Sequence, residues 1–106
     1  MEEKVRWEIF ENAKCRVNDL VRTQSCAALH KLHFIPMASG SSEIYVFYEK
    51  NSDVESFKMN LSKEIERVFI DEFSERGVPK DLLKFYFDSH ENVENNYRGS
   101  YFLRLR

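Results

Sequence analysis

The chain contains few of the residues that cross-link or interrupt a fold. Its 106 residues include two cysteines, two prolines and three glycines. Cys15 and Cys26 cannot supply the disulfide framework of a small secreted domain, so a reducing compartment is the expected environment. No apolar run approaches the roughly 18 residues that a transmembrane helix needs. The start, Met1-Glu2-Glu3-Lys4, lacks the basic-then-apolar order of a signal peptide. We therefore expect a cytoplasmic protein without membrane contact.

The composition predicts one folded domain. Hydrophobic residues make up 42% of the chain and aromatic residues 14%. Such a chain is too apolar for intrinsic disorder, which requires low hydrophobicity with high net charge. A length near 100 residues suits a single domain, so we assign residues 1–106 to one unit.

Helical periodicity dominates two parts of the sequence. Apolar residues recur three or four positions apart from Val5 to Leu20, which predicts a long first helix. A second helix is expected to begin at the capping-box pattern Ser52-Asp53-Val54-Glu55. Gly77 followed by Val78-Pro79 is typical of a left-handed helix end.

Four segments have the pattern of strands. Residues 44–48 are continuously β-branched or aromatic, which predicts a central strand buried on both faces. Residues 29–38, 84–88 and 101–106 are the others, although a helix continuing to Lys31 competes with the first of these, so residues 26–38 stay open. The resulting order α-β-β-α-β-β predicts an α+β two-layer sandwich, with two helices packed on a mainly antiparallel sheet.

Two groupings could carry chemistry. On a helix, His30 and His33 would share a face and could bind zinc with Cys26, whereas on a strand they would point to opposite faces. Asp88 and His90 follow a strand, where an Asp-oriented histidine base would make a small enzyme conceivable. Neither grouping has the further ligands or the nucleophile that its chemistry needs, so we expect no catalysis, metal or cofactor.

Nucleic acid is an unsuitable partner for the aromatic strand 44–48. The strand contains no basic residue and is flanked by Glu43 and Glu49. Phosphates require Lys or Arg, so these aromatic residues are predicted to belong to the core.

The small net charge of −2 conceals an uneven distribution. Residues 43–94 contain seven basic and thirteen acidic side chains, a net charge of −6, while residues 1–42 carry +1 and residues 95–106 carry +3. An acidic surface beside apolar residues suits a basic protein partner, because complementary charge speeds association. The predicted partner-binding residues are the acidic Glu64, Asp71, Glu75, Asp88, Glu91 and Glu94 and the apolar Met59 and Ile70.

The C-terminal part resembles some small bacterial immunity proteins, which neutralise contact-dependent growth-inhibition and other polymorphic toxins. The resemblance covers about residues 44–106 and depends on an aromatic strand, the turn Asp88-Ser89-His90-Glu91-Asn92-Val93 and a final Tyr/Phe-rich segment ending in Arg. It implies a cytoplasmic inhibitor that binds the C-terminal domain of a cognate toxin, often a basic nuclease. The alternatives are the small enzyme and a homodimeric structural or regulatory domain, with Met59 and Ile70 or a sheet edge as the interface.

Overall fold

A computed structural model of the protein describes residues 1–23 and 28–105. Its elements, in chain order, are α1 (Glu3–Thr23), β1 (Leu29–Pro36), β2 (Ser42–Tyr48), α2 (Asn51–Ser56), α3 (Leu61–Glu75), the 3-10 turn η1 (Lys80–Leu82), β3 (Leu83–Ser89), α4 (His90–Tyr97) and α5 (Tyr101–Arg104). The α+β class is confirmed, whereas the order α-β-β-α-β-β is wrong. Among the described helices, none has the length and apolar character needed to cross a membrane.

The three strands form one mixed sheet in the order β1-β2-β3. β1 and β2 form an antiparallel hairpin, and β3 runs parallel to β2. The expectation of a mainly antiparallel sheet is therefore wrong. The physical reason is the connection: α2 and α3 carry the chain back along the sheet, so β3 starts at the same end as β2.

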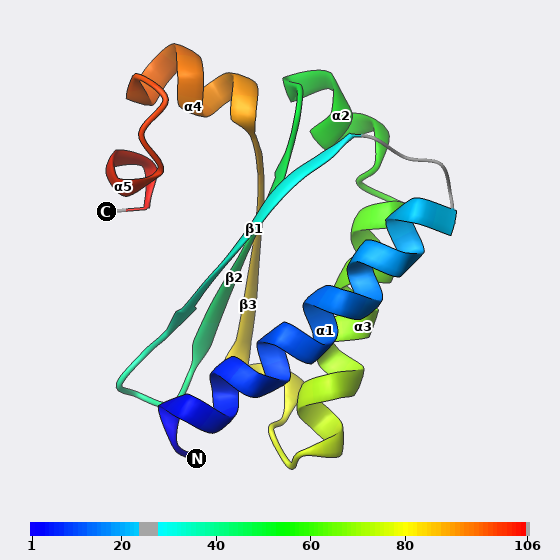
Figure 1. The fold of residues 1–106 in the computed structure, drawn as a ribbon, viewed down its shortest axis with the longest axis vertical. Helices are drawn as coiled ribbons and strands as arrows, with labels where there is room; N and C mark the ends of the chain where they lie inside the picture. The colour runs from blue at the N-terminus through cyan, green and yellow to red at the C-terminus, as the bar shows by residue number, and fades with distance from the viewer. Residues whose placement is uncertain (24–27, 106) are drawn as a thin grey trace.

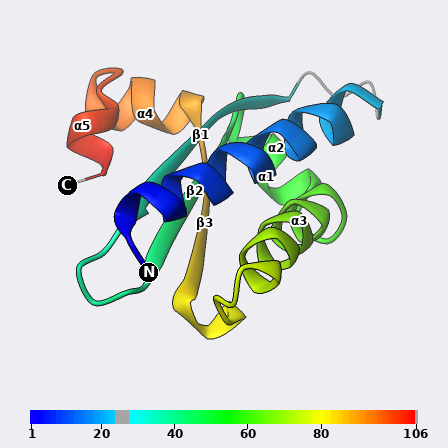
Figure 2. The same ribbon diagram turned by 60° about the horizontal axis from the view of Figure 1, so that its bottom comes forward.

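Helices cover the two faces of the sheet unequally. Figure 1 shows α1 and α3 on one side of the strands and α4 and α5 on the other, and Figure 2 shows the same arrangement from another direction. β2 lies in the middle with most of its side chains buried, as its continuous apolar sequence predicted. Its residues alternate between two clusters: Ile44, Val46 and Tyr48 face α1 and α3, while Tyr45 and Phe47 face α4 and α5.

The predicted apolar stripe of the first helix is confirmed. Ile9, Phe10, Ala13 and Val17 are buried in the larger cluster. There they meet Leu61, Ile65, Phe69 and Phe73 of α3. The two helices are also joined at their surface by an ion pair of 2.9 Å between Arg16 and Glu72.

The predicted second helix is divided into α2 and α3. The Asn60 side chain accepts the Leu61 N–H at 2.7 Å and begins α3 after a turn. The predicted Ser52–Glu55 capping box is wrong, because the Asp53 carboxylate instead accepts the Lys50 N–H at 3.0 Å. The predicted end at Gly77 is confirmed: Gly77 has a φ of +85°, and the Val78 N–H reaches the Phe73 carbonyl at 2.9 Å.

Of the remaining strand predictions, one is wrong and one is confirmed. The strand expected at residues 101–106 is the short helix α5, because Ser100 accepts the Leu103 N–H at 3.3 Å and Tyr101 packs against the second cluster. Arg106 lies outside the described residues. The strand predicted at residues 29–38 is confirmed as β1 (Leu29–Pro36), so the competing helix does not extend to Lys31. Residues 26 and 27 of that open region also lie outside the described part.

Candidate functional site

Three of the predicted carboxylates form a row on α3. Glu64, Asp71 and Glu75 are spaced seven and four residues apart, so they share one flank of the helix. Asp71 and Glu75 are exposed, and Glu64 is half-buried. Helix α3 as a whole carries five acidic and two basic side chains, a net charge of −3. We call Glu64, Asp71 and Glu75 the α3 acidic row.

Met59 and Ile70 do not form one exposed apolar surface. Met59 lies in the turn before α3 and is 77% exposed, while Ile70 is half-buried against the larger core cluster. The helix break at Asn60 leaves Met59 outside α3, so it does not share a helical face with Ile70. The two residues therefore occupy different environments.

Asp88 is held in an internal network at the end of β3. Its carboxylate accepts the Ser89 N–H at 2.8 Å and the Asn92 side-chain amide at 2.9 and 3.1 Å. It also forms an ion pair with Arg104 of α5. The exposed fractions of the Asp88 and Arg104 side chains are 16% and 23%. Asp88 thus anchors the C-terminal helices.

The two carboxylates of α4 also make contacts within the protein. Glu91 accepts the backbone N–H of Asn51 at 2.8 Å, which links α4 to α2. Glu94 lies 3.0 Å from the Nε2 atom of His90. Helices α4 and α3 lie on opposite sides of the strands (Figure 1). The predicted acidic residues are therefore two separate sets, and the set on α4 and Asp88 has internal partners.

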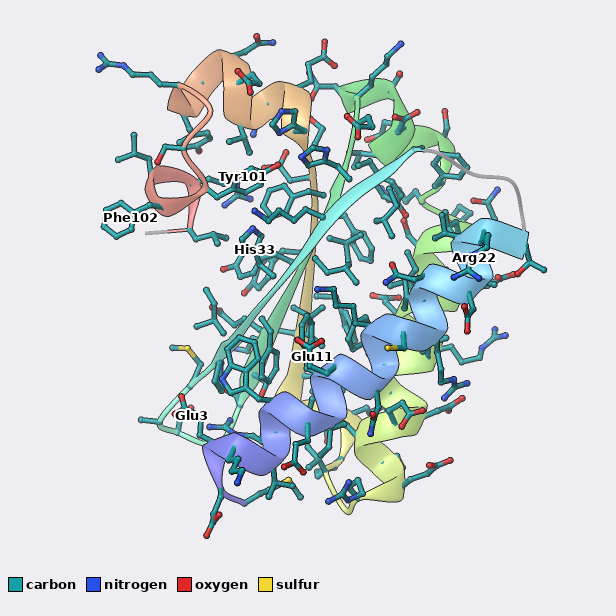
Figure 3. The ribbon with its side chains drawn as sticks, in the orientation of Figure 1. Glu3, Glu11, Arg22, His33, Tyr101 and Phe102 are labelled. Atoms are coloured by element: carbon teal, nitrogen blue, oxygen red, sulfur yellow. The ribbon has the colours of Figure 1, made fainter. Side chains whose placement is uncertain are left out.

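All three histidines converge on Tyr101. The ring of His90 stacks on that of His30 with centroids 4.0 Å apart, and its Nδ1 atom is 2.7 Å from the Tyr101 hydroxyl. The His33 ring lies 5.0 Å from that of Tyr101 (Figure 3). The pairing of β1 with β2 shifts register between Leu29 and Lys31, so one extra residue is inserted there. This bulge lets His30 and His33 both contact Tyr101, against the expectation that a strand would separate them.

Burial alters the acid–base behaviour of Tyr101 and His33. Desolvation, with smaller effects from Glu49, Glu94 and Asp88, raises the pKa of Tyr101 to about 12. Desolvation also lowers the pKa of His33, and the nearby Lys31 and Lys14 add to this effect. Tyr101 is therefore protonated and His33 neutral near pH 7. This chemistry fits packing and hydrogen bonding better than proton transfer.

Acidification should destabilise the protein in part through His33. Its pKa in the folded state is lowered from 6.5, so the unfolded chain binds the proton more readily. This contribution to stability is fully present above the unfolded pKa and is lost as the pH falls below about 6.5 toward the folded pKa. We expect His33→Leu to flatten the fall in unfolding free energy between about pH 7.5 and 5, measured by urea denaturation. Equal pH dependence in both proteins would contradict this assignment.

The geometry does not assemble the Asp88 and His90 grouping, and the His30, His33 and Cys26 grouping lies partly outside the described residues. Asp88 bonds to Ser89, Asn92 and Arg104, whereas His90 contacts Tyr101 and Glu94. An Asp-oriented His90 base is thus not the arrangement observed. Among residues 1–23 and 28–105, no three His, Cys, Asp or Glu side chains are grouped to hold a metal ion. Cys26, the third ligand considered, lies outside the described residues.

Sequence reasoning missed the residues that fix the C-terminal helices. Arg104 and Tyr101 were assigned to a strand, yet they supply the ion pair to Asp88 and the hydrogen bond to His90. Glu49, which was read only as an acidic flank, lies 2.8 Å from His30. A usable signal was the pair Gly99-Ser100, because glycine often follows a helix and serine often begins one.

The chain matches no protein-family model, no curated protein and no solved structure. The resemblance to immunity proteins stays a prediction.

Proposed function

We propose that the protein neutralises a toxin by binding its basic C-terminal domain through the α3 acidic row. The observation that carries the proposal is the alignment of Glu64, Asp71 and Glu75 on a helix of net charge −3. Asp71 and Glu75 are exposed at the surface. The resemblance of residues 44–106 to immunity proteins supplies the class of partner.

The position of the charges favours α3 over α4 as the binding surface. Asp88 and Glu91 accept hydrogen bonds from the protein itself, so their use by a partner would require internal contacts to break, whereas Asp71 and Glu75 are exposed on α3. The row on α3 lies on a long, regular helix that is fixed by the buried Ile65, Phe69 and Phe73. A helix fixed in this way presents its carboxylates without a backbone ordering cost at binding.

The mechanism is competition for a cationic surface. A nuclease domain binds the phosphates of its substrate through Lys and Arg. Carboxylates of the α3 acidic row would occupy the same cations and exclude nucleic acid. No group of the inhibitor takes part in a reaction, so neutralisation requires only a long-lived complex.

Reversing the charge of the row should slow association. The variant E64K/D71K/E75K is expected to reduce the association rate constant about tenfold at low salt, and much less at about 0.5 M salt, where the Debye length is only a few ångströms. The measurement is stopped-flow binding to the basic toxin domain identified by co-purification with this protein. Protection of cells that express this toxin domain should fall in parallel.

A matched control separates the position of the charges from their number. Glu3, Glu8 and Glu11 are exposed on α1, and E3K/E8K/E11K changes the net charge by the same amount. This control should associate much faster than the α3 variant. Equal rates for the two variants would assign the effect to net charge and remove α3 as the docking surface. Failure of the unmodified protein to bind or protect would remove the proposed function.

A further inference from the structure

An open groove lies between β3 and the segment from α2 to α3. It has a volume of about 430 Å³, and the residues that line it include Phe85 and Phe87 of β3, Ser62 and Glu66 of α3 and the exposed Met59. Phe85 and Phe87 are only partly buried against the larger core cluster, so two apolar side chains of β3 are left partly uncovered at this groove.

The two edge strands of the sheet, β1 and β3, differ in how well they are protected against pairing with a further strand. β1 ends in Pro36 and contains the bulge near His30, and both features hinder further strand pairing. β3 pairs with β2 over seven residues without a register shift and contains no proline. Among residues 1–23 and 28–105, no strand pairs with its outer side. Tyr86, in the middle of β3, is 38% exposed.

The sequence of β3 is complementary to itself in the antiparallel direction. With Tyr86 opposite Tyr86 of a second copy, Phe85 faces Phe87, and Lys84 lies opposite Asp88, whose carboxylate keeps its ion pair with Arg104. Paired aromatic side chains are cross-strand pairs that stabilise antiparallel sheets. Tyr86 already stacks on Tyr45 of β2 with centroids 4.8 Å apart, so a second Tyr86 would extend an existing aromatic row.

We propose that β3 is a dimerisation edge at which a second copy of this chain adds antiparallel to β3 and forms a continuous six-stranded sheet. The two-fold axis passes beside Tyr86, which places the same surface of each copy in contact with the other. A seven-residue strand pair is a small interface, so the dissociation constant is expected in the micromolar range. The inference is independent of the proposed function, which uses the α3 acidic row.

The first test measures mass against concentration. Light scattering should give the monomer mass of 12.7 kDa at low micromolar concentration and approach twice that value at several hundred micromolar. Tyr86→Lys should keep the monomer mass throughout, because two lysines would meet at the axis. Within one chain the new lysine can pair with Glu43, whose carboxylate lies 3.4 Å from the Tyr86 hydroxyl. The control Phe102→Lys changes a more exposed aromatic residue on α5 and should dimerise like the unmodified protein.

The second test fixes the register by cross-linking. In a background with Cys15 and Cys26 replaced by serine, Tyr86→Cys should oxidise to a disulfide-linked dimer, since directly opposed Cα atoms are about 4.5–5.5 Å apart. Lys84→Cys on the same strand should not, because its two copies would be about 14 Å apart along the antiparallel pair. This test remains informative if Tyr86→Lys does not fold.

Three outcomes would overturn the proposal. One is a monomer mass at every concentration together with no cross-link at residue 86. Another is a dimer that persists in folded Tyr86→Lys, which would place the interface elsewhere. The third is a monomeric protein whose toxin binding is abolished by Tyr86→Lys, which would make the β3 edge a site for a strand of another protein.

Discussion

Replacing Arg6 with methionine should lower the free energy of unfolding by about 2–4 kcal/mol. Each hydrogen bond from a charged donor contributes about 1.5–3 kcal/mol. Part of this loss is offset, because methionine does not carry the desolvation cost of a buried charge. Arg6 is 7% exposed. Its guanidinium donates to the carbonyls of Met37 and Ser41, both at 3.0 Å, and to the Ser42 hydroxyl at 3.2 Å. It therefore fastens α1 to both sides of the β1–β2 turn.

Urea denaturation of Arg6→Met beside Lys4→Met provides the measurement and its control. Lys4 is exposed on the same helix, so its replacement should change stability by less than about 0.5 kcal/mol. Arg6→Lys should fall between the two, because an ammonium group cannot span three acceptors with the geometry of a guanidinium. An Arg6→Met variant as stable as Lys4→Met would show that the turn holds its position without α1.

Elements with a strong internal pattern were predictable from the sequence. The stripe from Val5 to Leu20 and the continuous apolar strand 44–48 each repeat one simple period. The glycine at position 77 has a positive φ, as its sequence context indicated. In these cases local preference and tertiary burial favour the same structure.

In the final segment, residues 101–105, local preference and tertiary burial favour different structures. Residues 101–105 have no helix-length periodicity, and their alternation favours a strand. Their structure depends on contacts that are distant in sequence, because Tyr101 and Leu105 complete the cover that Val93 and Tyr97 of α4 begin on the second face of the sheet. The Arg6 contacts are equally distant, since their acceptors lie more than thirty residues away. Neither arrangement is encoded in a local window of sequence.

Only part of the candidate binding surface could be predicted from the sequence, for the same reason. Spacing along one helix placed Glu64, Asp71 and Glu75 together. Counting charge along the chain could not show that the basic C-terminal segment folds back and neutralises Asp88 through Arg104. The acidic surface formed by residues 43–94 is therefore smaller than the charge count along the sequence suggests. The proposed docking charge lies mainly on α3.

Replacing Arg104 with methionine should cost about 2–3 kcal/mol of unfolding free energy, because it leaves the mostly buried carboxylate of Asp88 with neutral donors only. The structure should first be lost locally, at the C-terminal helices. Helix α5 is four residues long, and Arg104 is its ionic link to β3. Amide hydrogen exchange should therefore accelerate in α5 and in the C-terminal turn of α4 more than in α1 or α3.

A second pair in the chain supplies the control. Arg22 and Asp19 are 3.0 Å apart, but their side chains are 78% and 71% exposed. Arg22→Met should change stability by no more than about 0.5 kcal/mol, as is usual for exposed ion pairs. In a double-mutant cycle, Asp88→Asn with Arg104→Met should cost less than the sum of the single changes, because each single change leaves a partner without its opposite charge. Additive costs would mean that Arg104 holds α5 by packing alone and that its charge has no part in closing the second face of the sheet.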